Sequence, residues 1–159
     1  MSARKRYRPY GINRFAHAVA MAGATKLSRD DVLQRASYVH ECCSKIITGK
    51  ATPVEWRHLA DCVNIVEELC RMRLVDGQTT LEATQDVIVG ILDRKRDTGS
   101  VALYAIEVGI LQSFAADYSA VLSGITQSEY MQAQTRVEDR IRRVLSGERI
   151  PASTRVVAA

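Results

Sequence analysis

The sequence has none of the motifs by which most enzymes are recognised. Its histidines and cysteines are not accompanied by a glycine-rich turn or an evident oxyanion donor, so a Cys–His nucleophile is not expected. Strand patterns are absent, and no apolar run approaches the length of a membrane span. We therefore expect a non-enzymatic protein that has no cofactor and no membrane partner.

The four cysteines do not form a recognisable disulfide or metal framework. No pair has the CxxC spacing, and all four lie inside expected helices: Cys42, Cys43, Cys62 and Cys70. Cys42 and Cys43 are adjacent but point about 100° apart on a helix, so inert packing is favoured over redox sensing. Buried, reduced thiols are typical of a cytoplasmic protein.

What the sequence does contain is helical periodicity with matching start and stop signals. Four capping boxes precede apolar stripes: Ser28 with Asp31, Thr52 with Glu55, Thr79 with Glu82, and Thr126 with Glu129. The predicted helices span residues 13–22, 29–48, 51–74, 79–96, 100–123 and 126–146. The predicted fold is an all-α bundle of five main helices plus a short N-terminal one, with the second and third forming an antiparallel hairpin.

Residues 51–74 are predicted to be the central helix. Two apolar strips cover most of its circumference, and Trp56 is expected to anchor one end. A narrow polar stripe remains, which we expect to be solvated, with a partner-binding row as the alternative. The members of this stripe are Arg57, Asp61, Asn64, Glu68 and Arg71. The helix from 100 to 123 is expected to be the second most buried.

The net charge of +4 is unevenly distributed. Residues 1–14 contain five basic residues and no acid, while the remainder is nearly neutral. We divide the chain into a basic arm (1–12), one helical domain (13–147) and a loose tail (148–159). The arm is the candidate site for nucleic acid or a protein partner, because cations neutralise phosphates and tyrosines stack on bases. Its candidate residues are Arg4, Lys5, Arg6, Tyr7, Arg8 and Tyr10.

Two further patterns are a possible zinc-binding set and a segment similar to a signal peptide. In an antiparallel hairpin, two histidines and two cysteines would lie near one level and could hold zinc, although packing is the favoured interpretation and we predict no metal site. The four are His40, Cys43, His58 and Cys62. Residues 15–24, after the basic arm, are similar in outline to a signal peptide, but His17 interrupts the run and we expect no cleavage.

The N-terminal half also resembles a known group of proteins. The segment KRYRP at Lys5–Pro9 and the segment GKAT at Gly49–Thr52, with further residues of the central helix (Trp56, Leu59, Asn64, Glu67, Leu69), resemble small uncharacterised proteins of temperate phages and prophages of proteobacteria. The resemblance implies a phage origin and a protein that binds and modulates a host protein or defence complex. The alternative is a nucleic-acid-binding accessory protein. A homodimer is expected to cover excess apolar surface.

Overall fold

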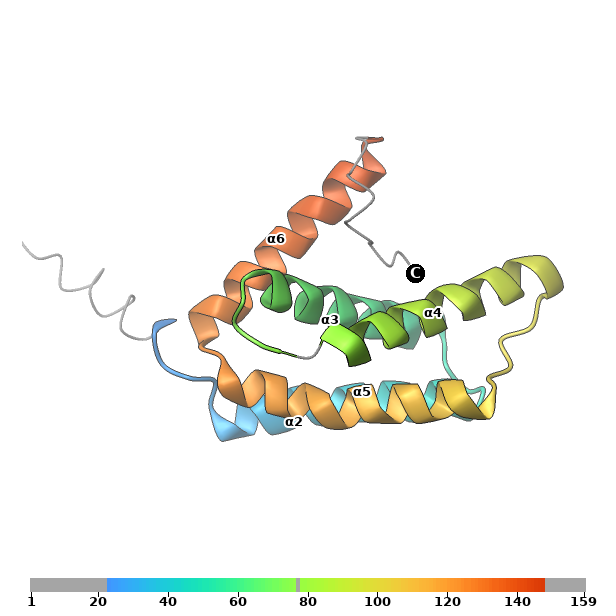
Figure 1. Ribbon diagram of the computed structural model, residues 1–159, viewed down its shortest axis with the longest axis horizontal. Coiled ribbons are helices and arrows are strands. Elements are labelled where there is room, and N and C mark those ends of the chain that lie inside the picture. Colours follow the sequence, from blue (N-terminus) through green and yellow to red (C-terminus); the bar gives the residue numbers. More distant parts are fainter. Residues whose placement is uncertain (1–22, 77, 148–159) are drawn as a thin grey trace, which may run out of the picture.

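The computed structural model describes residues 23–76 and 78–147, and five helices follow one another in this part of the chain (Figure 1). They are α2 (Arg29–Ile47), α3 (Pro53–Arg71), α4 (Gln78–Thr98), α5 (Ala105–Gly124) and α6 (Gln127–Leu145). The prediction of an all-α bundle is confirmed for the described part, which contains no strand. The basic arm, the predicted helix at 13–22 and the tail lie outside the described residues.

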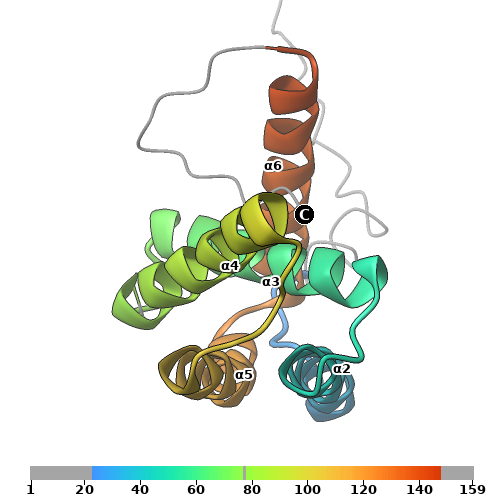
Figure 2. The same ribbon diagram turned by 90° about the vertical axis from the view of Figure 1, so that its right-hand side faces the viewer.

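The helices form two layers and one projection (Figures 1 and 2). In the lower layer of Figure 1, α2 and α5 lie side by side and antiparallel, and this is the most extensive helix pair. The upper layer contains α3, which crosses the pair obliquely, and α4, which packs on α3 and α5. Helix α6 packs on α3 and extends away from both layers. The predicted α2–α3 hairpin therefore exists as an oblique crossing, and the antiparallel neighbour of α2 is α5.

The predicted capping boxes set most of the helix starts. At α3 the Thr52 amide donates to Glu55 Oε2 (2.8 Å), and at α6 the Thr126 amide donates to Glu129 Oε2 (2.7 Å). At α2 the Asp31 amide donates to Ser28 Oγ (3.1 Å). These side chains satisfy amides that have no partner inside the helix, which fixes where each helix begins.

The start of α5 differs from the prediction. It begins at Ala105 and not at Ser100. The Tyr104 amide donates to Glu107 Oε2 (2.8 Å), so the N-cap is Tyr104, four residues after Ser100. The guanidinium of Arg94 then fixes the preceding connection, donating to the Ala102 carbonyl (3.2 Å) and to Glu107 Oε2 (2.7 Å). A long-range arginine contact therefore outweighs the local helix signal.

The predicted core stripes are buried in one cluster, but the polar stripe of α3 is exposed to solvent as expected only at its two ends, at Arg57 and Arg71. Leu59, Val63 and Leu69 are completely buried, and Trp56 packs half-buried against the same core. On the polar stripe, however, only 1% of Asn64 and 4% of Glu68 is exposed. The reason for Glu68 is α6, which crosses this part of α3 and places Arg136 and Arg140 on the Glu68 carboxylate.

Helix α5 is less enclosed than predicted. Its apolar face is buried, but Tyr104 and Ile106 in the cap and first turn are 63% and 73% exposed. At this end of the helix, the Arg94 guanidinium of α4 lies over one face of the Tyr104 ring at 4.7 Å and leaves most of the ring exposed. Within the described residues, no helix combines the length and apolarity needed to cross a membrane.

Candidate functional site

One concavity of the described part is a groove between α3, the connection after it, α4 and α5. Its volume is about 360 Å³. Its walls are mainly apolar and include Val66 of α3, Leu81 of α4 and Phe114, Tyr118 and Val121 of α5. Leu81, Phe114 and Tyr118 also belong to the buried core, so the groove floor is part of the bundle and is formed before any partner binds. We call this concavity the α4–α5 groove.

The end wall of the groove exists because α3 stops abruptly. The Arg73 amide donates to the Cys70 carbonyl (2.9 Å) and the Leu74 amide donates to the Leu69 carbonyl (3.1 Å), the bond pair of a Schellman cap. Arg73 adopts a φ of 57°, in the left-handed region that usually requires glycine. This turn directs Val75 and Asp76 across the end of the groove, where both line it.

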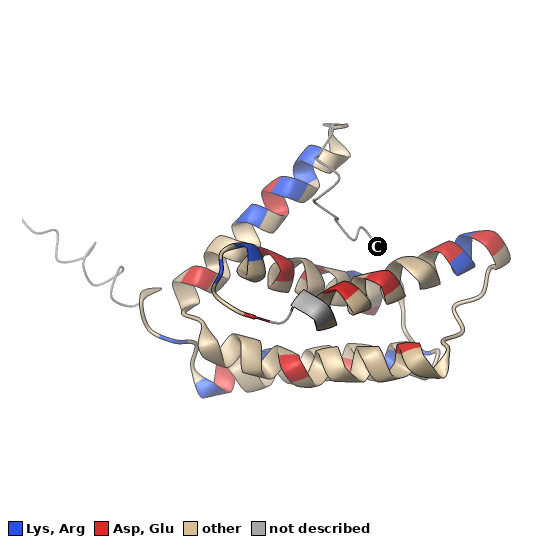
Figure 3. Cartoon of the chain, viewed as in Figure 1, with Lys and Arg blue, Asp and Glu red and all other residues tan. Residues whose placement is uncertain are grey.

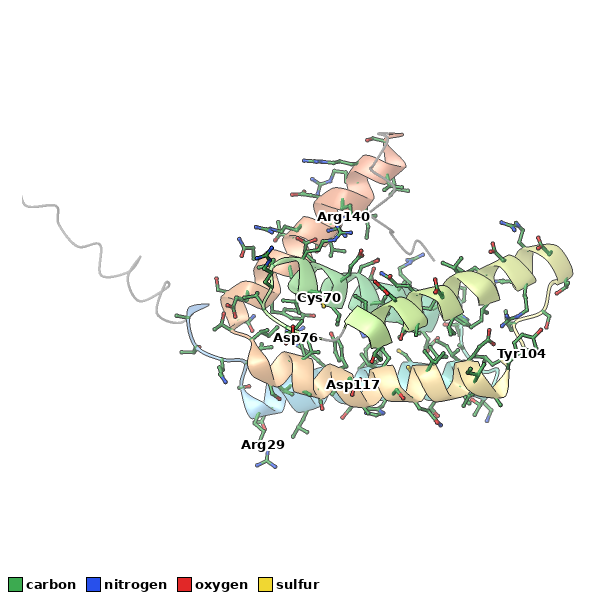
Figure 4. All side chains as sticks on the ribbon, in the orientation of Figure 1. Arg29, Cys70, Asp76, Tyr104, Asp117 and Arg140 are labelled. Carbon is green, nitrogen blue, oxygen red and sulfur yellow. The ribbon has the colours of Figure 1, made fainter. Side chains whose placement is uncertain are left out.

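The rim of the groove is acidic. Asp76 comes from the connection and Asp117 from α5, and Figure 4 shows both on the side of the molecule that faces the viewer. No lysine or arginine lines the groove, and neither carboxylate has an ion-pair partner among the described residues. An apolar floor with two unpaired carboxylates fits a ligand that carries apolar or aromatic groups beside positive charge.

The arginines of α6, in contrast, are largely neutralised. Arg136 and Arg140 both donate to the carboxylate of Glu68, and Arg140 Nη1 also lies 3.6 Å from Glu67 Oε2. Arg142 pairs with Asp139 at 3.2 Å. Figure 3 shows these blue positions interspersed with red ones along α6. Arg136 and Arg140 consequently fasten α6 to α3, and with Glu138 and Asp139 among the arginines the helix does not present a basic face free of acids.

The two histidines and two cysteines that were the alternative zinc set do not converge on one point. His58 Nε2 lies 3.5 Å from Cys62 Sγ, but His40 is exposed and Cys43 is buried in the core. In the described part, no three His, Cys, Asp or Glu side chains are arranged to hold a metal. The ring of His58 instead packs against the ring of Tyr38, with 4.2 Å between the ring centroids and a tilt of 59°. Both residues line a second concavity of about 300 Å³, together with Arg35, Tyr118 and Tyr130. The guanidinium of Arg35 already lies over the Tyr130 ring, at 4.4 Å.

The thiols are poor nucleophiles. Burial raises the pKa of Cys42 to about 11 and the pKa of Cys43 and Cys62 to about 12, and burial also raises the pKa of Cys70. None of the four forms a disulfide. At neutral pH these cysteines are therefore protonated and act as small apolar side chains, as the inert-packing interpretation predicts.

The sequence predicts a candidate site in the arm and contains no local signal for the groove. The arm residues Arg4, Lys5, Arg6, Tyr7, Arg8 and Tyr10 lie outside the described residues. The signals for the groove, Asp76 and Asp117, are 41 positions apart in sequence and only the tertiary fold brings them to one rim. Comparison with known proteins adds nothing to this site, because no family, curated protein or solved structure matches the chain significantly.

Proposed function

We propose that the protein is a non-enzymatic interaction protein whose α4–α5 groove binds a basic, partly apolar segment of a partner protein. The observation that carries this proposal is a preformed apolar floor below two carboxylates, Asp76 and Asp117, for which the described residues provide no ion-pair partner. The apolar floor supplies affinity by removing a side chain from water, and the carboxylates select positive charge.

The resemblance of the N-terminal half to small phage proteins supports a host protein as the partner. On this proposal the partner is a host protein or a component of a host defence complex, and binding alters its activity by occupying its basic segment. The four reduced cysteines support a cytoplasmic setting for this interaction. Homology of origin alone does not fix function, so the groove and its charges carry the proposal.

The test compares two pairs of charge reversals in capture experiments from nuclease-treated host lysate. Asp76→Lys/Asp117→Lys reverses the groove rim, and Asp93→Lys/Asp97→Lys makes the same change at the far end of α4, where both acids are exposed. A partner retained by the wild-type protein and the far-end variant but lost from the rim variant supports the proposal. Equal capture by all three proteins refutes it. A thermal melt of each variant confirms folding.

The second candidate function is nucleic-acid binding through Arg4, Lys5, Arg6, Tyr7, Arg8 and Tyr10. Two observations favour the arm over α6 as its site: the arm sequence has cations without acids, and three of the four arginines of α6 are paired with Glu67, Glu68 or Asp139. This function predicts an affinity that falls steeply with salt and disappears when residues 1–12 are deleted. Binding that survives the deletion would rule the arm out as the site.

A further inference from the structure

We infer that the basic arm of the chain, residues 4–10, docks in the α4–α5 groove of the same molecule and competes there with the partner segment. This inference rests on the proposed function of the groove and adds its regulation. The arm would then occupy the groove until a partner segment of higher affinity displaces it.

The chemistry of the arm matches that of the groove. Residues 4–10 read RKRYRPY and place two tyrosines among four cations, without a single acid. The groove offers the converse, with apolar side chains on its floor and the two carboxylates of Asp76 and Asp117 at its rim. No other stretch of the sequence joins aromatic rings to unopposed positive charge in this way. A tyrosine ring fills apolar space while its neighbouring arginines face the rim.

The segment that follows the arm enters the described part of the molecule close to the groove. Residues 25–27 are fastened to the turn between α5 and α6, because the Leu27 amide donates to the Ile125 carbonyl (3.3 Å) and the Gln127 amide donates to the Thr25 carbonyl (3.0 Å). Gly124, the residue next to this turn, lines the groove. The chain therefore enters the described part of the molecule beside one end of the groove.

The length of the intervening chain is sufficient. The 12 residues from 11 to 22 span up to about 40 Å when extended and about 18 Å when helical. Helix α5, which forms one wall of the groove, has 20 residues and is about 30 Å long. Because the arm is tethered, its effective concentration at the groove is on the order of millimolar, so weak contacts are enough to keep it docked.

Limited trypsin digestion of the full-length protein tests the inference without any partner. Trypsin cleaves after Arg4, Lys5 and Arg6, so docking protects these bonds, and a synthetic peptide of residues 1–12 gives the unprotected rate. We expect the arm of the wild-type protein to be cleaved about tenfold more slowly than in Asp76→Asn/Asp117→Asn, since two surface charge pairs are lost. The control Asp93→Asn/Asp97→Asn should retain the protection. High salt should remove it from the wild-type protein, when rates are normalised to the peptide.

The outcomes are distinct. Equal cleavage of the arm in the wild-type protein, the rim variant and the free peptide overturns the inference. Protection that increases with protein concentration shows that a second copy supplies the arm, and protection lost on nuclease treatment shows that nucleic acid covers it; both overturn intramolecular docking. Because no partner is present, failure here leaves the capture experiment unaffected. If the capture experiment fails while the arm is protected, the groove serves the arm alone.

Discussion

Glu68 of α3 and Arg140 of α6 form a charged pair in the interface between the two helices, with 6% and 11% of their side chains exposed. Arg136 donates to the other oxygen of the same carboxylate, at 3.3 Å, so both oxygens of Glu68 have cationic partners. This pair explains why a stripe with the composition of a solvated surface is buried. A single buried charge without its partner would destabilise this interface. Helix α3 supplies the carboxylate and α6 supplies the guanidinium that balances it.

Removing one member of this pair should destabilise the protein strongly. We expect Glu68→Ala to lower the free energy of unfolding by about 3 kcal/mol, because Arg140 would remain buried with only the longer contact to Glu67, at 3.6 Å, to balance its charge. Urea unfolding measures the effect. Asp139→Ala is the matched control, since the Asp139–Arg142 pair is mostly exposed and should contribute less than about 1 kcal/mol. Similar losses in the two variants would show that the buried pair has no special role.

The left-handed residue at the end of α3 gives a second prediction. We expect Arg73→Gly to raise the free energy of unfolding by roughly 0.5–1 kcal/mol, because relief of the steric cost of a positive φ exceeds the added chain entropy of glycine. Gly49 occupies the same position in the Schellman cap of α2 with a φ of 69°, so Gly49→Ala should cost about 1 kcal/mol. Denaturant titration of the two variants measures both changes in the free energy of unfolding. Stabilisation by Gly49→Ala would contradict the prediction.

The buried thiols predict a dependence on high pH. The pKa values of Cys43 and Cys62 rise from 9.0 to about 12 on folding, so above pH 9 the folded protein holds protons that the unfolded chain releases. The free energy of unfolding should therefore be unaffected below pH 9 and fall between pH 9 and 12. Unfolding curves across this range, with a reductant present, measure the effect. Stability that increases over this interval would be inconsistent with burial of the thiols.

The same burial predicts slow chemical modification. At pH 8 a thiol reagent should react slowly with the native protein and rapidly with all four cysteines after denaturation, because the thiolate is the reactive form. Cys70, the only half-exposed one, should react first. Counting the modified thiols by mass spectrometry over time tests this order, and a rapid reaction of Cys42 or Cys43 in the native protein would contradict it.

The exposed apolar residues of α5 bear on the expected homodimer. Tyr104 and Ile106 lie close together at the start of the helix and are mostly exposed, so we propose that they contribute to a dimer interface. Sedimentation at micromolar concentration should then give a dimer, and Ile106→Glu should give a monomer with unchanged helix content. A monomeric wild-type protein would contradict the proposal.

The helices were predictable because their signals are local. Capping residues such as Thr52 and Thr126 act on amides two or three positions away, and the stripe Val32, Val39 and Ile46 repeats with the period of a single helix. The start of α5 was not predictable in this way. It depends on Arg94, which lies 13 positions before Glu107 and is brought to it only when α4 and α5 pack together.

The two candidate sites differ in how visible they are in the sequence. The arm was visible in the sequence because its charges are consecutive, whereas the groove requires α3, α4 and α5 to converge. Asp76 and Asp117 look like ordinary surface acids until their neighbours Leu81, Phe114 and Tyr118 are seen to form an apolar floor between them. Glu68 shows the opposite error, since a charged residue that looked solvated is buried by a helix almost 70 positions later.

The sequence alone determined that the described part of this chain is helical, where most of the helices begin, and which face of each is apolar, because these properties depend on neighbours within one or two turns. The tertiary structure decided which helices touch, which charges are paired and where a groove remains open. Those properties depend on contacts between side chains that are far apart in the sequence. The angles at which the helices cross, and the surfaces that they leave uncovered, decide which of these side chains come into contact.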